Sequence, residues 1–213
     1  MNQLPRVVIG AGGHAKVLID CLDQMGATVL GCLDADPALR GKMVGRVTVL
    51  GDDSLLERHA PESVLLVNAI GSTQTMERRR AVYEMLKAKG YSFATVLHPT
   101  AVIGAGVELG EGVQVMAGGV VQAGTRIGAN SIVNTGVSVD HDCVIGAHVH
   151  LAPGCVVSGG VTIGDRTHFG TAAVAIHGVT VGADCLVAAG AVVVNDVVGG
   201  MRVMGVPAKQ VRQ

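Results

Sequence analysis

The chain has 213 residues, of which 49% are hydrophobic and 15% are charged, and its formal net charge is −1 at pH 7. This near-neutral balance provides no general basic surface, which excludes nucleic acid as the expected main partner. No window approaches the roughly 20 uninterrupted apolar residues of a membrane span, and residues 1–25 lack a signal-peptide pattern, so we expect a cytoplasmic protein without membrane insertion.

The first half of the chain alternates short apolar runs with helical patterns. Strands are predicted at 6–9, 28–33, 64–70 and 92–97, and helices at 14–25, 52–59 and 75–89. Strands that alternate with helices are typical of a small parallel α/β domain. We therefore predict a Rossmann-like domain with about four strands over residues 1–96.

A glycine-rich turn, GAGGHA over residues 10–15, follows the first predicted strand, and Asp34 follows the second. This pattern formally fits the dinucleotide fingerprint, in which glycines let a phosphate approach the free N–H groups of a helix N-terminus. The predicted domain has only about half the strands of a full dinucleotide fold. The turn therefore favours a nucleotide-sugar site over an NAD site, and a glycine turn without a ligand is the remaining alternative.

From residue 97 onward, an apolar residue recurs at every sixth position without an insertion. The recurring residues are Leu97, Ile103, Leu109, Val115, Val121, Ile127, Val133, Val139, Ile145, Leu151, Val157, Ile163, Phe169, Ala175, Val181, Val187 and Val193. A period of six fits neither an α-helix nor a flat alternating strand, whereas three such hexads form one triangular β-coil of 18 residues. The narrow interior of such a coil agrees with the presence of only two Phe, two Tyr and no Trp. The second half is therefore predicted to be a β-solenoid.

The cysteines follow the same register. Cys143, Cys155 and Cys185 each occupy the fifth position of a hexad, and Cys21 and Cys32 lie in predicted regular structure. No pair of them has metal-ligand spacing, so we expect all five to be small buried packing residues.

Several short motifs accompany the repeat. They are Gly10-Ala11-Gly12-Gly13-His14, Ala69-Ile70-Gly71, Leu97-His98-Pro99-Thr100-Ala101, Val139-Asp140-His141-Asp142 and Gly205-Val206-Pro207-Ala208-Lys209. With these motifs the chain resembles the hexapeptide-repeat sugar acetyltransferases that acylate nucleotide-linked amino sugars, a group that includes sialic acid O-acetyltransferase-like proteins. The resemblance covers almost the whole chain and implies a left-handed parallel β-helix over residues 97–213, including a short C-terminal tail.

The resemblance also implies the reaction. It is acetyl transfer from acetyl-CoA to the 4-amino group of a nucleotide-linked 4-amino-4,6-dideoxy sugar, with GDP-perosamine as the first candidate acceptor and a UDP-linked 4-amino sugar as the second. O-acetylation of a sugar such as sialic acid is the alternative reaction, and a non-catalytic β-helix that binds sugar nucleotides is an alternative from another class. The flat faces of the coil are rich in Val and Ala and would leave apolar surface exposed in a monomer, so we expect a homotrimer, and the resemblance implies that acetyl-CoA lies between two subunits. We expect neither a metal nor NAD as cofactor.

The family motifs place the sugar nucleotide on the N-terminal domain. The matching residues are Gly12, Gly13, His14, Asp34, Asp36, Gly71 and Asn134. Gly12, Gly13 and His14 are expected beside the phosphates, and Asp34 and Asp36 at the nucleoside. Gly71 is expected in the cleft, and Asn134 at the acceptor sugar. Arginines at 78–80 could clamp a phosphate, but such a run on a helix more often faces solvent, so we leave them out of the expected site.

One polar column of the coil has the composition of a catalytic site. Positions 18 apart should stack, and the third hexad position, which carries no inward apolar side chain, holds His141, Gly159, His177 and Asn195. Asp140 and Asp142 flank His141, and a nearby carboxylate raises the basicity of an imidazole and fixes its tautomer. The resemblance implies that His141 is the general base, that Asp142 tunes it and that the Gly159 N–H holds the thioester oxygen. Many relatives carry Glu in place of Asp142, so contact of the shorter side chain with the imidazole, directly or through water, is left open.

The remaining site residues are also implied by the resemblance. His150 is expected to line the active site on the acetyl-CoA side, the backbone at Thr171 and Ala189 to line the pantetheine arm, and Lys209 to contact a phosphate of the coenzyme. His150 and His168 are 18 residues apart and should stack, but without a third acidic or Cys ligand we expect no metal there. His168 is given no role in the reaction, and neither are His98, His148 and His177.

Overall fold

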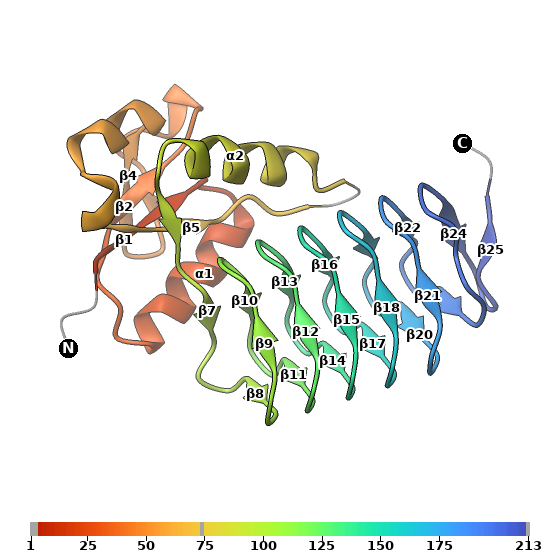
Figure 1. The fold of residues 1–213 in the computed structure, drawn as a ribbon. Helices are drawn as coiled ribbons and strands as arrows, with labels where there is room; N and C mark the ends of the chain where they lie inside the picture. Colours follow the sequence, from red (N-terminus) through yellow and green to blue (C-terminus); the bar gives the residue numbers. More distant parts are fainter. Residues whose placement is uncertain (1–3, 73–74, 212–213) are drawn as a thin grey trace.

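The computed structural model describes residues 4–72 and 75–211, which form an α/β domain followed by a β-helix (Figure 1). The described part of the N-terminal domain contains a six-stranded sheet in the order β3-β4-β2-β1-β5-β6. Its β3–β4 pair is antiparallel and the other neighbouring strands are parallel. The strands are β1 (Arg6–Ile9), β2 (Val29–Leu33), β3 (Met43–Val44), β4 (Val47–Gly51), β5 (Leu65–Asn68) and β6 (Ser92–Phe93).

The helices of this domain cover the sheet and reach the β-helix. They are α1 (Gly13–Gln24), α2 (Glu77–Ala88) and the 3-10 helices η1 (Pro37–Leu39), η2 (Asp53–Arg58) and η3 (Pro61–Ser63). Helix α1 buries an apolar side that includes Ala15, Leu18 and Leu22, and these side chains pack in one cluster with Val96 and Met116 of the first coils. Because α1 is shared between the sheet and the coils, the two domains are held against each other by a common apolar core.

The sequence predicted most of these elements but underestimated the sheet. Of the three predicted helices, those at 14–25 and 75–89 form as α1 and α2, and the one at 52–59 forms as the 3-10 helix η2. The sheet has six strands, whereas about four were predicted, because the sequence analysis missed the β3–β4 hairpin. Strand β3 has only two residues, and β4 alternates buried with partly or fully exposed residues, so neither makes a long apolar run. The strand predicted over 92–97 divides into β6 and β7, which belong to different sheets.

The second domain is a triangular β-helix whose three sheets we call faces 1, 2 and 3. Face 1 contains β7 (Val96–Leu97), β10 (Gln114–Val115), β13 (Ile132–Val133), β16 (His150–Leu151), β19 (His168–Phe169), β22 (Leu186–Val187), β24 (Arg202–Met204) and β25 (Lys209–Gln210). Face 2 contains β8 (Val102–Ile103), β11 (Val120–Val121), β14 (Ser138–Val139), β17 (Val156–Val157), β20 (Val174–Ala175) and β23 (Val192–Val193). Face 3 contains β9 (Glu108–Leu109), β12 (Arg126–Ile127), β15 (Val144–Ile145), β18 (Thr162–Ile163) and β21 (Thr180–Val181).

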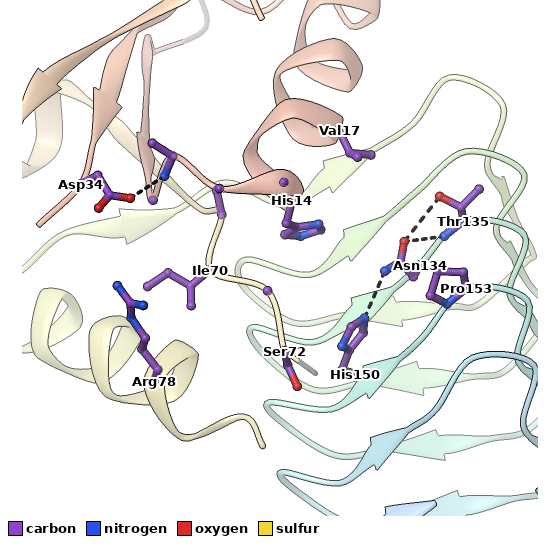
Figure 2. A pocket seen from close by; sticks show the side chains of 16 residues that line it. His14, Val17, Asp34, Ile70, Ser72, Arg78, Asn134, Thr135, His150 and Pro153 are labelled. Carbon is purple, nitrogen blue, oxygen red and sulfur yellow. Dashed lines mark hydrogen bonds between the residues drawn. The ribbon is translucent and has the colours of Figure 1, made fainter. Parts of the chain in front are cut away.

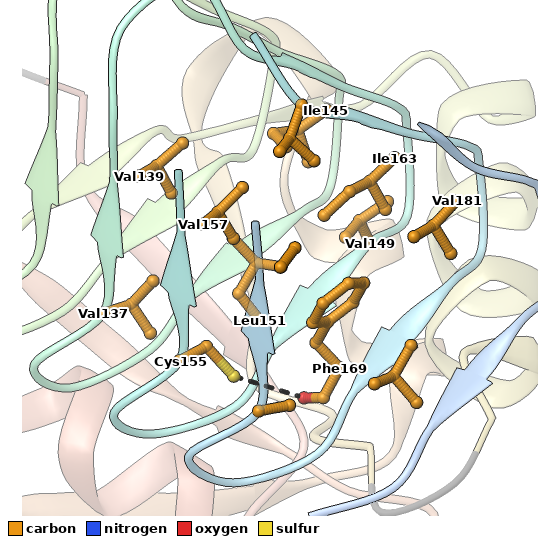
Figure 3. Packing of buried hydrophobic residues seen from close by; sticks show 14 of the residues in the cluster. Val137, Val139, Ile145, Val149, Leu151, Cys155, Val157, Ile163, Phe169 and Val181 are labelled. Carbon is orange, nitrogen blue, oxygen red and sulfur yellow. Dashed lines mark hydrogen bonds between the residues drawn. The ribbon is translucent and has the colours of Figure 1, made fainter. Parts of the chain in front are cut away.

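The register of the coils is the one that the hexad repeat predicts. Strands on one face pair in parallel with partners 18 residues apart, as Val139 does with Val157. The second residue of these strands points inward, and Figure 3 shows Val139, Val157, Leu151 and Phe169 packed together in the core. The three coil cysteines are buried in the same cluster, and all five described cysteines are free and buried. The hexad position of a residue therefore decides its direction.

The two domains also meet through a buried polar contact that the sequence did not predict. Arg79 on α2 was expected to face solvent, but its side chain is among the largest that are fully buried. Its Nε donates to the Asn130 carbonyl of the β-helix, and its Nη1 donates to the Asn68 and Ile70 carbonyls after β5. The expectation failed because α2 turns this position into the junction, where three carbonyls accept from Nε and Nη1 while the buried Nη2 makes no hydrogen bond within the described residues.

The fold class expected from the sequence, a small Rossmann-like domain followed by a hexapeptide-repeat β-helix, is confirmed. Within residues 4–72 and 75–211, no helix combines the length and the apolar character that a membrane crossing requires.

Candidate functional site

A cavity of about 580 Å³ lies between the two domains. Loops that follow β1 and β5 line one side of it, and residues at the corner between faces 1 and 2 line the other side (Figure 2). The predicted sugar-nucleotide residues found in its lining are Gly12, Gly13, His14, Asp34, Gly71 and Asn134. His150 also lines it, as does Arg78, which the sequence analysis left out of the site. The domain junction therefore assembles residues that are far apart in the sequence.

The glycine turn leaves the start of α1 open toward this cavity. Gly10 adopts a φ of 100°, which favours glycine, and the Gly12 N-cap makes no side-chain hydrogen bond to the first turn of α1. The free N–H groups of the first turn favour an anionic group. Asp34 stands beside the turn, with its carboxylate accepting from the Ala11 N–H at 2.8 Å and from the Asp36 N–H at 3.0 Å. Asp34 thus holds the turn in shape as well as lining the cavity.

Two predicted residues lie elsewhere. The Asp36 carboxylate accepts from the Ala38 N–H at 2.9 Å and caps η1, and Asp36 is not in the lining of the large cavity. Lys209 is exposed on β25, at the far end of the β-helix from the N-terminal domain (Figure 1). The structure therefore gives Asp36 a local structural contact and brings Lys209 near none of the cavity residues described above.

A second cavity, of about 470 Å³, continues from the first along the β-helix. The two linings share Ser72, Asn134, His150 and Pro153. The second lining then extends to Thr171 and Ala189, the two residues expected beside the pantetheine arm. The sugar-nucleotide side and the coenzyme side thus meet at Asn134 and His150.

His150 is held neutral at this meeting point. Asn134 Oδ1 accepts from the Thr135 N–H at 2.8 Å, so Asn134 Nδ2 donates to His150 Nε2 at 3.1 Å (Figure 2). Burial, followed by the charges of His168, His14 and Arg79, lowers the pKa of His150 to about 3. The two rings stack as their spacing predicts, with centroids 5.0 Å apart. Because its Nε2 lone pair is occupied and its pKa is low, His150 is a poor proton acceptor.

Histidine ligands for a metal are not gathered here. Across the part of the chain that the structure describes, no three His, Cys, Asp or Glu side chains are arranged to hold a metal ion. His168 Nδ1 instead lies 3.0 Å from Ser72 Oγ. The His150–His168 pair therefore shapes a neutral polar wall.

His141 has the geometry of a base. Its Nδ1 lies 2.8 Å from Asp142 Oδ2, so the aspartate reaches the imidazole directly, which the sequence left open. This hydrogen bond, with the charge of Asp140, raises the pKa of His141 above its ordinary value. In the neutral ring the shared proton sits on Nδ1, and Nε2 carries the free lone pair.

Gly159 lies against this lone pair. A Cβ at position 159 would be 2.6 Å from His141 Nε2, so the imidazole occupies the space that any other residue would fill. The Gly159 N–H donates to no acceptor among the described residues. The expected oxyanion donor and the expected base are thus adjacent, one coil apart.

The base and the cavities lie on different corners of one chain. Asn134 belongs to the corner between faces 1 and 2, whereas His141 and Gly159 belong to the corner between faces 2 and 3. The lining of neither joined cavity includes His141. Face 2 therefore separates the two halves of the expected site.

Sequence reasoning missed three polar residues of the junction. They are Arg79, Asn68 and Gln114, which are all buried, and Arg79 and Gln114 both donate to the Asn68 carbonyl. Gln114 takes the outward position of its hexad, and α1 covers it. A signal was present in the sequence, because the outward positions of face 1 on either side of Gln114 hold the apolar residues Val96 and Ile132, which indicates that this part of the face is covered.

Comparisons with known proteins cover both domains. Residues 7–91 match the PglD N-terminal domain family, residues 124–159 match the bacterial transferase hexapeptide family (six repeats), and residues 160–194 match the hexapeptide repeat of succinyl-transferase. No curated protein matches the chain significantly.

Solved structures resemble the chain over nearly its full length. A histidine-to-asparagine mutant of perosamine N-acetyltransferase from Caulobacter crescentus, in complex with CoA and GDP-perosamine, is 42% identical; the match covers 98% of this chain and 97% of that chain, with a TM-score of 0.92. The acetyltransferase domain of PglB from Neisseria gonorrhoeae FA1090, in complex with acetyl coenzyme A, is 37% identical with coverages of 99% and 100% and a TM-score of 0.90. WeeI from Acinetobacter baumannii AYE is 28% identical with coverages of 98% and 100% and a TM-score of 0.87.

Proposed function

The chain belongs to the hexapeptide-repeat, acetyl-CoA-dependent N-acetyltransferases of nucleotide-linked amino sugars, and we propose that it acetylates the 4-amino group of GDP-perosamine. The observation that carries the proposal is the joining of two cavities at Asn134 and His150. One cavity has the glycine turn and Asp34 for a nucleotide sugar, and the other runs along the coils toward Thr171 and Ala189. A UDP-linked 4-amino sugar is the second candidate acceptor.

The reaction proceeds by direct attack. The nitrogen lone pair of the sugar amine attacks the thioester carbon, and His141 Nε2 accepts the proton that the nitrogen loses as the new C–N bond forms. The Gly159 N–H donates to the oxyanion. The intermediate then collapses with cleavage of the C–S bond, and the imidazolium returns its proton to the CoA thiolate. Acetylated sugar and CoA thiol leave, and the base is regenerated.

No acyl-enzyme is required. The coil cysteines are buried, and burial raises the pKa of the Cys143 and Cys155 thiols, which disfavours the thiolate that a nucleophile needs. Cys143 is the cysteine nearest to His141 in sequence, and its Sγ is directed to the Ser158 carbonyl at 3.2 Å. The nucleophile is therefore the substrate amine.

Face 2 has the composition of a subunit interface. The outward residues of its strands are Val102, Val120, Ser138, Val156, Val174 and Val192, and Val102 and Val156 are 54% and 43% exposed. The outward residues of face 3 are Glu108, Arg126, Val144, Thr162 and Thr180. An exposed ladder of valines on one sheet is typical of a protein contact. We therefore assign face 2 to a homotrimer.

This interface would complete the site. Face 2 lies between the corner with Asn134 and the corner with His141, so packing face 2 around a threefold axis brings one corner of each copy toward the other corner of its neighbour. His141 and Gly159 of one copy then face the joined cavities of the next. The separation of base and cavity within one chain is the observation that supports a shared site.

The assay that tests the proposal measures thiol release from acetyl-CoA with GDP-perosamine, a UDP-linked 4-amino sugar and sialic acid as acceptors. We expect turnover that depends on a nucleotide-linked amino sugar and is fastest with GDP-perosamine. Turnover with sialic acid alone would point to O-acetylation, and binding of sugar nucleotide without thiol release would point to a non-catalytic protein.

Complementation tests the shared site. A His141→Ala chain has an intact cavity, and an Asn134→Ala chain has an intact base. If each site combines a cavity from one copy with a base from the next, an equal random mixture restores activity in about one quarter of the sites. Mixtures that stay as inactive as the two parents would place both halves in one subunit.

A further inference from the structure

His14 is tied to the domain junction through a chain of two hydrogen bonds. His14 Nε2 lies 2.8 Å from Gln114 Oε1, and Gln114 Nε2 donates to the Asn68 carbonyl at 2.7 Å. Gln114 is fully buried, and Asn68 is 2% exposed. His14 itself lines the large cavity, and Figure 2 shows its ring at the start of α1. The contact therefore connects a cavity residue to a rigid interior.

These two bonds determine which ring nitrogen of His14 carries the proton. A backbone carbonyl only accepts, so the amide group of Gln114 that faces Asn68 must be its NH₂ group. The Gln114 oxygen then faces His14, and it requires a donor, so the proton of His14 is on Nε2. In the neutral ring Nδ1 has a lone pair and no proton. No hydrogen bond within the described residues engages this atom.

Burial and the charge of Arg79 keep the His14 ring neutral. Burial, followed by the charge of Arg79, lowers the pKa of His14 to about 4. Arg79 remains a cation, since burial lowers its pKa only to about 9, and it makes no ion pair with a carboxylate among the described residues. Asp34 and Arg78 line the same cavity, and neither contributes to the shift of His14. At neutral pH His14 is therefore an acceptor and not a cation.

We propose that Gln114 is a positioning residue that fixes His14 with its Nδ1 lone pair open to the cavity, so that His14 accepts a hydrogen bond from a hydroxyl or amino group of the sugar nucleotide. A phosphate oxygen also carries only lone pairs and would be repelled at this atom. The role expected for His14 therefore changes. The N–H groups at the start of α1 bind the phosphate, and His14 binds a hydroxyl or amino group that donates to its Nδ1. This inference rests on the proposed function for the identity of the ligand.

The first test needs no substrate. Histidine labelled with ¹⁵N distinguishes a protonated from an unprotonated ring nitrogen, and a His14→Asn variant assigns the signals. We expect unprotonated Nδ1, protonated Nε2 and no titration of His14 between pH 5.5 and 8, as the low pKa of about 4 requires. A proton on Nδ1, or titration near pH 6.5, would overturn the proposal whatever the enzyme acts on.

The second test removes the positioning contact. Gln114→Met keeps the side-chain length, and the Asn68 carbonyl still accepts from Arg79 Nη1 at 2.6 Å, so no buried carbonyl is orphaned. Losing one directed hydrogen bond is expected to raise the KM for GDP-perosamine about tenfold with kcat nearly unchanged, and to mix the two tautomers in the ¹⁵N spectrum. Ile132→Met is the matched control, because Ile132 pairs with Gln114 on the next coil and is fully buried.

The outcomes separate this inference from the proposed function. A shift of the His14 Nδ1 signal with GDP alone would identify a ribose hydroxyl as the donor, and a shift that needs GDP-perosamine would identify the hexose; either supports the proposal. An equal KM increase in both Met variants, with the tautomer unchanged in Gln114→Met, would reduce Gln114 to a packing residue. If no sugar nucleotide were turned over, the proposed function would fail, while the ligand-free tautomer would still decide the role of Gln114.

Discussion

The two domains are both built on parallel strands, yet they position functional residues in different ways. In the β-helix, a residue 18 positions along the chain lies directly on its predecessor, as His168 does on His150. In the N-terminal domain and at its junction, position depends on how helices cross a sheet, and Arg79 is buried while Arg78 lines the cavity. In the β-helix the position of a residue in the repeat determines where its side chain lies, whereas in the layered domain this depends on how the helices pack.

Replacing His141 is expected to have the largest effect, and it tests the coil side of this contrast. Positioned proton transfer contributes about 10²–10⁴-fold, so His141→Ala should lower kcat by at least about 100-fold. The side chain is 54% exposed, so we expect little change in stability or in the affinity for either substrate. Steady-state kinetics from pH 6 to 9 measure the effect. Wild-type kcat in this variant across that range would place the base elsewhere or show that none is needed.

The sequence predicted the β-helix well because its register is local. The hexad positions of Cys143, Cys155 and Cys185 were sufficient to predict their burial, and the spacing of His150 and His168 was sufficient to predict their stacking. The inward side chains of the coil pack against those of neighbouring coils and not against the first domain, so their burial follows from the repeat alone.

The junction could not be predicted in the same way. Gln114 has the outward position of its hexad and is buried only because α1 packs over it, which no local pattern reports. The Arg78–Arg80 run looked like a solvated helix face, since three successive residues point in three directions around a helix and the sequence does not show which one meets the coils. The sugar-nucleotide residues that came from family motifs line the cavity, with the exception of Asp36, and the buried polar residues that support them were not foreseen.

Arg79 tests the junction. In Arg79→Met the Ile70 and Asn130 carbonyls lose their guanidinium partners, while the Asn68 carbonyl keeps Gln114. An unsatisfied buried acceptor costs about 1–3 kcal/mol, so we expect the free energy of unfolding to fall by about 2–4 kcal/mol in urea denaturation. Arg78→Met is the control, because Arg78 is exposed on the neighbouring position and should change stability by less than about 0.5 kcal/mol. Equal effects would mean that helix α2, and not the buried contact, is being perturbed.

Two valines with nearly equal exposure test whether the faces of the coil differ in role. Val156 on face 2 is 43% exposed, and Val144 on face 3 is 46% exposed. A lysine at an apolar interface loses hydration without a partner, so Val156→Lys should weaken trimer association about 10- to 100-fold, while Val144→Lys leaves it unchanged. Light scattering over a concentration series separates the two. Trimers of equal stability in both variants would remove face 2 from the interface, and a wild-type monomer at micromolar concentration would remove the trimer itself.

Replacing Asp142 is expected to have the smallest effect. It tests the most local contact in the coil, between Asp142 and its sequence neighbour His141. The hydrogen bond to Asp142 and the charge of Asp140 raise the pKa of His141, so the imidazole holds its proton to a higher pH than an ordinary histidine. In Asp142→Asn the imidazolium loses the partner that stabilises it, and the pKa of His141 falls. The base is then free at lower pH, so the acidic limb of the kcat/KM profile should move downward. The maximum should fall only about tenfold, because the base is retained while its orientation and basicity suffer. An unmoved acidic limb would mean that the limb reports another group, such as the substrate amine, and that Asp142 orients the ring without setting its charge.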